Sequence, residues 1–294
     1  MSHTANDNFK GALLMMASMA AFTFNDAFMK AIADELPLFQ ILTLRGILTV
    51  ALIAAMMFLR GKTDFGIPAN DRGKVLLRVI AEITSAYFFL TALFNMPLAN
   101  VSAILQALPL TVTLAAAFFF GEAVGWRRMS AILIGFLGVW LIVRPGTEGF
   151  TIYSLYALIA VAFVTLRDLV TRRLSKDTPS MAVSFYSAVG VTLFFAAGSP
   201  AQGWAPVSGF AALMITGAAL MIIGGYLCSI MVMRVGEISF VATFRYTSLV
   251  WALLIGWFVF GDWPAPLTLI GASIVVGSGV FMLLRERQIK LGKV

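Results

Sequence analysis

Apolar side chains fill ten long runs of the chain, and each run ends at a short stretch of turn-forming or charged residues. A helix needs about 20 mostly apolar residues to cross the hydrocarbon core of a bilayer, because each residue adds about 1.5 Å to its length. Proline, glycine and acidic residues separate the runs, as in Asp34-Glu35-Leu36-Pro37, and such residues interrupt helices. The pattern predicts ten membrane-spanning helices, at residues 11–31, 37–59, 75–96, 98–120, 128–143, 151–171, 181–198, 208–232, 238–260 and 266–284.

The composition agrees with an all-α polytopic membrane protein. Of the 294 residues, 60% are apolar and only 12% are charged, whereas soluble globular proteins carry about 25% charged residues. So little charge cannot cover the surface of a soluble domain, and such high hydrophobicity excludes a disordered chain. The single cysteine, Cys228, excludes a disulfide scaffold, and with the single histidine, His3, it argues against a metal site. We therefore expect no metal and no cofactor.

The positions of the basic residues predict the orientation of the chain. Of the 21 Lys and Arg residues, 15 lie at one set of helix ends, two (Lys30 and Arg144) lie at the opposite set, and four lie inside helices. Because cytoplasmic loops carry the excess of basic residues, the larger set and both termini are expected in the cytoplasm. The net charge of +7 is spread over six separate segments, so it does not indicate binding to nucleic acid.

The second half of the chain repeats scarce residue types of the first half. Shifts of 140 to 142 residues superpose Asp26 on Asp168, Lys30 on Arg172, Pro37 on Pro179, Gly121 on Gly261 and Gly138 on Gly279. Each half, 1–146 and 147–294, has five predicted helices, so the two halves enter the membrane from opposite sides. Such inverted repeats are typical of secondary transporters, whose binding site lies near the midplane between the repeats.

Several of these residues resemble a known family. The matching positions are Asp26-x-x-x-Lys30 at the end of the first helix, Arg45 early in the second, Pro109 inside the fourth, and Gly121-Glu122 at its end. They look like the EamA-type branch of the drug/metabolite transporter superfamily. The stretch from Asn25 to Arg45 also resembles the carriers for S-adenosylmethionine, riboflavin and carnitine-like metabolites.

The resemblance implies a ten-helix carrier of the bacterial inner membrane, present as a monomer or a homodimer. Its central cavity is expected to be lined mainly by helices 1–4 and 6–9, with helices 5 and 10 outside. The chain departs from the family pattern at two positions, since Ser187 stands where the second half would repeat Arg45, and Leu249 where it would repeat Pro109. We therefore expect the halves to be functionally unequal.

Four arginines lie inside predicted helices. A charged side chain at a helix centre costs about 2.5–3.5 kcal/mol on insertion scales, so each one needs a partner, a water-filled cavity or a route to the interface. Arg78 and Arg167 lie about four residues from predicted cytoplasmic ends, within reach of the interface. Arg45 and Arg245 lie about eight residues, roughly 12 Å, inside their helices, where this escape is harder.

The depth of the acidic residues predicts two ion pairs or substrate-bridged clusters. Asp26 lies at the depth of Arg45 in the outer half, and Glu82 lies at the depth of Arg245 in the inner half. Such clusters would bind a charged substrate or act as gates.

Other interpretations of these charges remain open. Both predicted pairs would equally serve to fix the helix register. Lys30 lies four residues after Asp26, and Arg78 four residues before Glu82, so each acid also has a basic partner on its own helix. Asp168, the repeat partner of Asp26, is expected at the inner mouth.

Aromatic and polar residues near the helix centres would give a cavity its chemistry, because ligand sites are mostly apolar with a few placed polar groups. The candidates are Tyr87, Gln106, Tyr186, Tyr226, Tyr246 and Trp251. Pro109 removes a backbone hydrogen bond and is expected to kink the fourth helix.

These features predict a secondary transporter that moves a small organic metabolite by alternating access, with the lipid bilayer as its surroundings. The metabolite would be an amino acid or a related zwitterionic, cationic or aromatic compound, and transport would be coupled to protons or to exchange. A broad exporter of drugs or toxic metabolites is the main alternative. A membrane-embedded enzyme or a channel is a remote one, since the chain has no P-loop or dinucleotide glycine pattern.

Overall fold

The structure is a computed structural model that describes residues 5–59, 61, 64–121, 124–144, 151–235 and 241–290. Glu122 and the boundary between residues 146 and 147 lie outside these ranges. The helices are α1 (Ala5–Lys30), α2 (Leu38–Leu59), α3 (Ala69–Asn95), α4 (Leu98–Leu105), α5 (Leu108–Phe120), α6 (Trp126–Val143), α7 (Ile152–Arg172), α8 (Ser180–Gln202), α9 (Gly209–Val235), the 3-10 helix η1 (Ala242–Tyr246), α11 (Thr247–Phe260) and α12 (Pro266–Lys290).

Ten helical segments of the described chain are long and apolar enough to cross a membrane, and no strand occurs in the described residues. The ten-helix, all-α prediction is confirmed. Two spans consist of two pieces each: α4 with α5, and η1 with α11. The largest difference at a helix start is in α3, which begins at Ala69 and not at residue 75.

Proline and glycine set many of the helix boundaries. Pro68, Pro97 and Pro179 directly precede α3, α4 and α8, where a missing backbone N–H costs no helical hydrogen bond. Gly121 and Gly261 end α5 and α11 in the left-handed conformation, with φ of 67° and 69°. Glycine adopts this conformation without the steric penalty of a side chain.

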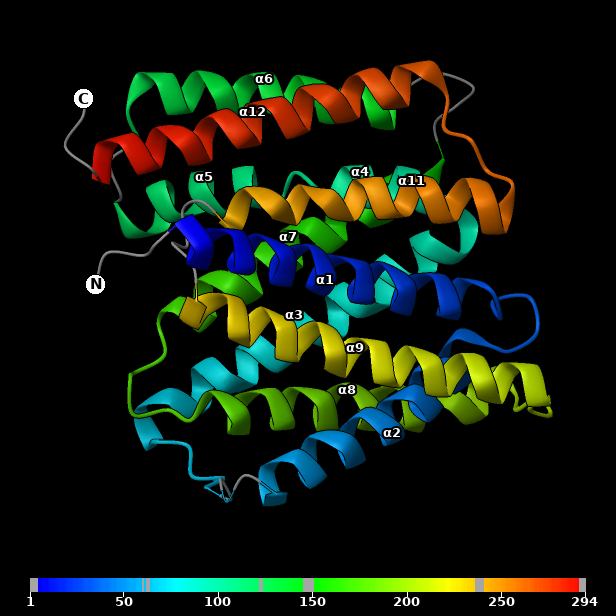
Figure 1. Cartoon of the computed structure of the whole chain (residues 1–294). Coiled ribbons are helices and arrows are strands. Elements are labelled where there is room, and N and C mark those ends of the chain that lie inside the picture. The colour runs from blue at the N-terminus through cyan, green and yellow to red at the C-terminus, as the bar shows by residue number, and fades with distance from the viewer. Residues whose placement is uncertain are drawn as a thin grey trace.

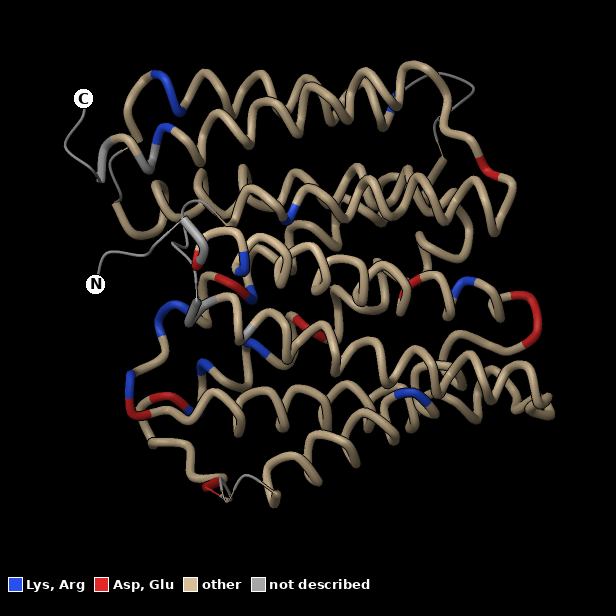
Figure 2. Tube along the Cα trace, in the orientation of Figure 1, with Lys and Arg blue, Asp and Glu red and all other residues tan. Residues whose placement is uncertain are grey.

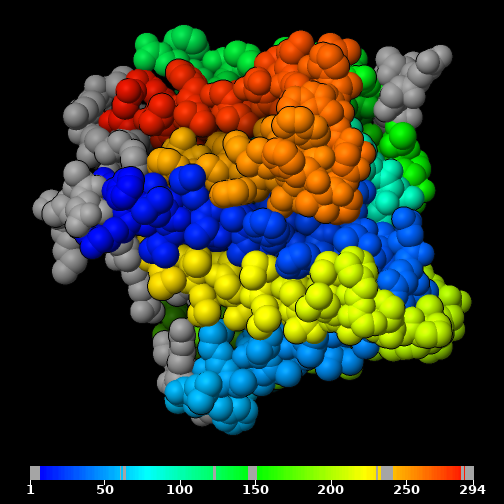
Figure 3. Space-filling model, turned by 45° about the vertical axis from the view of Figure 1, so that its right-hand side comes forward, coloured from blue at the N-terminus to red at the C-terminus, as the bar shows by residue number. Residues whose placement is uncertain are grey.

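The helices pack in pairs that are far apart in the sequence. α1 packs along α9, α3 along α7, α2 against α8, and α6 against α12 (Figure 1). On one face α1 lies between α9 and α11 (Figure 3). The pair of α6 and α12 forms one edge of the bundle, and α2 and α8 lie at the opposite edge (Figure 1).

The two ends of the bundle differ in charge. α1 begins and α12 ends at the same end, and most Lys and Arg positions gather there (Figures 1 and 2). We call it the basic end, and the other the opposite end. Between them, long apolar side chains such as Phe58, Phe118 and Phe258 are exposed on the outside of the helices. An apolar exterior of this extent is suited to lipid contact.

Two glycines bring α6 and α12 into backbone contact. A Cβ atom at Gly138 would lie 2.7 Å from the carbonyl oxygen of Gly271, and one at Gly271 would lie 2.6 Å from the carbonyl oxygen of Gly138. Small residues permit such close approach between membrane helices. The contact of these two helices therefore depends on both glycines.

We expect Gly271→Ala to destabilise the protein by about 1–3 kcal/mol, because the added methyl group meets backbone that cannot move aside easily. Thermal unfolding of the purified protein in detergent measures the effect as a lower midpoint. Gly277→Ala on the same helix is the matched control, since nothing lies within 4 Å of its Cβ position. Equal midpoints for the two variants would contradict the packing described.

Candidate functional site

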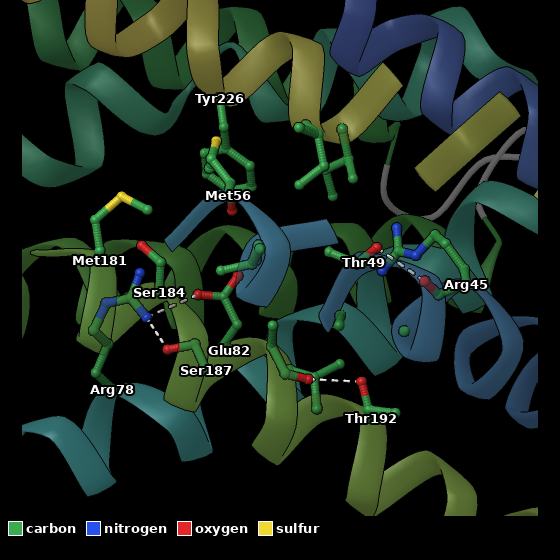
Figure 4. A pocket seen from close by; sticks show the side chains of 17 residues that line it. Arg45, Thr49, Met56, Arg78, Glu82, Met181, Ser184, Ser187, Thr192 and Tyr226 are labelled. Carbon is green, nitrogen blue, oxygen red and sulfur yellow. Dashed lines mark hydrogen bonds and ion pairs between the residues drawn. The ribbon is translucent and has the colours of Figure 1, made fainter. Parts of the chain in front are cut away.

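A cavity of about 130 Å³ lies between α2, α3, α8 and α9, inside the membrane-spanning part of the bundle (Figure 4). Its lining residues are Arg45, Gly46, Thr49, Ile53 and Met56 of α2; Arg78, Glu82 and Ala86 of α3; Met181, Ser184, Ser187, Ala188, Val191 and Thr192 of α8; and Ile222, Ile223 and Tyr226 of α9. Most of this wall is apolar, and the charged groups are few. Ligand sites commonly have this composition.

One charged cluster in the cavity wall is centred on Glu82. Its Oε1 atom accepts a hydrogen bond of 3.1 Å from Nη1 of Arg167, and its Oε2 atom lies 3.6 Å from Nη1 of Arg78. Arg78 also donates to Oγ of Ser187. Arg167 in turn donates from Nε to Oδ1 of Asp168 at 3.0 Å. Two arginines and two carboxylates thus balance each other where α3, α7 and α8 meet.

A second cluster surrounds Arg45. Its Nη1 atom donates to Oδ1 of the buried Asn25 at 3.3 Å, and Nδ2 of Asn25 donates to Oδ1 of Asp26 at 2.9 Å. The hypothesis that Asp26 pairs with Arg45 is therefore corrected in one respect, because the Asn25 amide connects the two groups. Lys30 hydrogen-bonds elsewhere: its Nζ atom donates to the carbonyl oxygens of Leu93 and Met96.

The two clusters contain the same local motif. A shift of 142 residues superposes Asn25-Asp26 on Arg167-Asp168. In both pairs the first side chain donates a hydrogen bond to the carboxylate that follows it. The partners differ, since Arg45 accompanies the first pair and Ser187 stands at its repeat position. The guanidinium is therefore on α2 in one cluster and on α7 in the other.

Aromatic rings lie between the cavity and the opposite end of the bundle. The ring centroid of Phe39 is 5.0 Å from that of Phe195 and 6.2 Å from that of Tyr87. Beside them, Gln40 donates to the carbonyl oxygen of Ala205 at 2.7 Å and accepts from its N–H at 2.9 Å. α2 is thus held against α8 and the α8–α9 loop on this side of the cavity.

Two of the tyrosines expected in the cavity lie beyond its ends. Tyr87 belongs to the aromatic cluster just described, and its ring also contacts Phe88. Tyr186 is half-exposed on α8, and its hydroxyl donates to the carbonyl oxygen of Phe65 at 3.1 Å. Tyr226, by contrast, lines the cavity as expected.

The predicted pair of Glu82 with Arg245 is wrong. Arg245 is exposed on η1, and Glu82 binds Arg167 and Arg78 instead. Tyr246 and Trp251 follow Arg245 in sequence but do not line the cavity. Tyr246 is buried next to Gly279 of α12, which contradicts the prediction that this stretch faces the substrate.

Gln106 and Pro109 mark an interruption in the fourth span. The helix stops at Leu105 and resumes at Leu108, so Pro109 is the second residue of α5. The buried Gln106 donates from Nε2 to Oγ of Ser248 at 2.7 Å. Ser248 lies just after the boundary between η1 and α11, which shows that the ninth span is also irregular, although it has no proline there.

The sequence analysis missed three residues of these clusters. Arg78 and Arg167 had been assigned to the membrane interface, and Asn25 had not been considered. The longer α3 places Arg78 nine residues inside its helix, too deep for a simple surface role. For Asn25 and Arg167, the shift of 142 residues that aligned their neighbouring aspartates was an available signal. Among the described residues, no group of three or more His, Cys, Asp or Glu side chains could hold a metal ion.

Comparisons with known proteins identify the family. The model of the EamA-like transporter family matches residues 9–144 and 151–285. The S-adenosylmethionine uptake transporter of Rickettsia felis is 24% identical over 276 residues, which cover 93% of this chain and 92% of the relative. The riboflavin transporter of Vibrio cholerae is 30% identical over 209 residues, 70% of each chain.

Two further matches agree with this assignment. The pseudopaline exporter of Pseudomonas aeruginosa is 25% identical over 272 residues, which cover 90% of this chain and 93% of the relative. A crystal structure of 18% identity aligns with a TM-score of 0.66 over 94% of this chain and 98% of the other, and it supports the fold alone. Because the family model matches most of the chain, this protein is a member of the EamA-like transporter family, in the drug/metabolite transporter superfamily.

Proposed function

We propose that this transporter is a secondary carrier for a small organic metabolite, and that the cavity between α2, α3, α8 and α9 is its substrate site. The supporting observation is the presence of Arg45, Arg78 and Glu82 in the wall of a cavity inside the spans. Charged groups at this depth are costly and usually mark a substrate or ion pathway.

Alternating access is the proposed mechanism, with the halves 1–146 and 147–294 as inverted repeats. Three observations support it. α1 with α9 and α3 with α7 are equivalent pairs when the halves are exchanged. Asn25-Asp26 and Arg167-Asp168 make the same contact. The interruptions in the fourth and ninth spans meet at Gln106 and Ser248. A carrier of this symmetry changes its accessible side when the repeats exchange conformations.

The names of the relatives supply the first substrates to test, S-adenosylmethionine and riboflavin. Export is a second candidate direction, because one relative is named an exporter. The proposal leaves the driving force as proton coupling or exchange, and the assembly as a monomer or a homodimer.

Filling the cavity is expected to abolish transport. Ala188 lines the cavity from α8, so Ala188→Trp would occupy the proposed site. Counterflow of labelled S-adenosylmethionine or riboflavin across proteoliposomes is the measurement, with a loss of at least about tenfold expected for a substrate that must desolvate in the same space. Leu193→Trp is the matched control on the same helix, because Leu193 is 63% exposed. Equal loss in both variants, or transport by neither the variants nor the wild type, would refute the proposed site.

The proposed orientation has the basic end and both termini in the cytoplasm of a bacterium. Cysteine labelling tests it in a Cys228→Ser background. Asp64 lies in the α2–α3 loop and Val207 in the α8–α9 loop, so the two positions are at different ends of the bundle. A membrane-impermeant maleimide should label Val207→Cys in spheroplasts and Asp64→Cys only after lysis. The reverse pattern would invert the orientation.

A further inference from the structure

Two buried polar atoms in the cavity wall lack a hydrogen-bond partner among the described residues. They are Nε of Arg45 and Oε2 of Glu82. Oε2 lies 3.6 Å from Arg78, an ion-pair contact that is too long for a hydrogen bond. A buried donor or acceptor without a partner is costly, particularly on a charged group. One cavity therefore presents an unsatisfied cationic donor and an unsatisfied anionic acceptor.

The chemistry of each group defines its ligand. A guanidinium has five N–H donors and no acceptor, and Arg45 uses one of them on Asn25. A substrate carboxylate matches the remaining donors, because arginine binds carboxylates through paired hydrogen bonds. The Oε2 atom of Glu82 accepts only, so it matches an N–H of a substrate cation. The two groups thus recognise opposite charges.

The depth of the two residues sets the spacing of those charges. Arg45 lies seven residues after Leu38, the first residue of α2, and Glu82 lies 13 residues before Asn95, the last residue of α3. Both helix termini are at the opposite end of the bundle (Figure 1). The backbones of Arg45 and Glu82 therefore lie at depths of about 10 and 20 Å from that end. Figure 4 likewise shows Arg45 at one side of the cavity and Glu82 toward Arg78 at the other.

The wall that accompanies these poles is largely apolar. Ile53, Ala86 and Val191 belong to it, and Thr49 is the hydroxyl residue on α2. The hydroxyl of Thr49 already donates to the carbonyl oxygen of Arg45 at 2.9 Å. Such a surface suits a hydrocarbon or flat segment that carries few hydrogen-bonding groups.

From these observations we infer that the substrate is a zwitterion with a carboxylate bound by Arg45, an N–H cation bound by Glu82, and several bonds of mainly apolar structure between them. The inference rests on the proposed function, since it specifies the substrate class of the same cavity. A zwitterion also preserves the existing charge balance, in which the carboxylates of Asp26, Glu82 and Asp168 accompany three arginines. A singly charged substrate would bring net charge into the membrane interior, where it is costly.

A chain-length series tests the inference on the purified wild-type protein. The probes are ω-amino carboxylates from glycine to 8-aminooctanoate, with the alkyl carboxylate and the alkylamine of each length as singly charged controls. Binding measured by calorimetry should be strongest at an intermediate length. At that length the zwitterion should bind at least about tenfold more tightly than glycine and than either control. Affinity that does not depend on chain length, or controls that bind as well as the zwitterion, would overturn the inference.

Variants assign the two poles. Arg45→Gln should lower the affinity of the best zwitterion to that of the matching amine, and Glu82→Gln should lower it to that of the matching carboxylate. Arg245→Gln is the control for loss of an arginine, because Arg245 is exposed on η1 and does not line the cavity. An equal loss in the control variant would contradict the assignment. If either cavity variant does not fold, the wild-type series alone decides.

Transport separates failure of this inference from failure of the proposed function. Wild-type proteoliposomes are offered the same probes together with S-adenosylmethionine and riboflavin. If only neutral or singly charged compounds enter, and Ala188→Trp blocks their entry, the carrier function stands and the zwitterion inference is wrong. If no compound enters the wild-type vesicles, the proposed function itself fails.

Discussion

The cost of ionised side chains inside a bilayer is the constraint on which this structure depends. Arg78, Glu82, Arg167 and Asp168 come from two helices that are not adjacent in the sequence, and they neutralise one another only because α3 packs along α7. Separating these helices would leave arginines and carboxylates in hydrocarbon, at a cost of about 2.5–3.5 kcal/mol for each residue at the helix centre on insertion scales. The packing of α3 with α7 and the burial of charge are therefore coupled.

The two charged clusters are related but unequal. Asn25-Asp26 and Arg167-Asp168 occupy corresponding positions, yet the first pair receives its guanidinium from α2, and the second contains its own. The neutral Ser187 leaves α8 without a charge, and Arg78 of α3 donates to its hydroxyl. In the proposed inverted repeat, this difference makes the cavity polar in a directional sense, with Arg45 and Glu82 at different depths.

The predicted helices agree with the structure because the length of an apolar run is a local property. The predicted depths of the arginines were less accurate because they depended on helix ends. α3 starts at Ala69, since its polar first turns, which include Asp71 and Lys74, continue the helix. Arg78 is thereby nine residues deep instead of about four. Arg245 was wrong for another reason: its depth was considered, but its direction around the helix was not, and η1 points it to the outside.

Apolar run length, charge position and the spacing of Asp26 and Asp168 were sufficient to identify a ten-helix membrane protein and its family resemblance. They were also sufficient to select Arg45 and Glu82 as residues that need an explanation. The partners of these residues followed from the fold alone, because Asn25 reaches Arg45 across two helices, and Glu82 meets Arg167 85 residues later in the chain. Periodicity reports burial along one helix. Contacts between helices depend on how each helix is rotated and on which neighbour it packs against, and the pairing of α3 with α7 supplied that information.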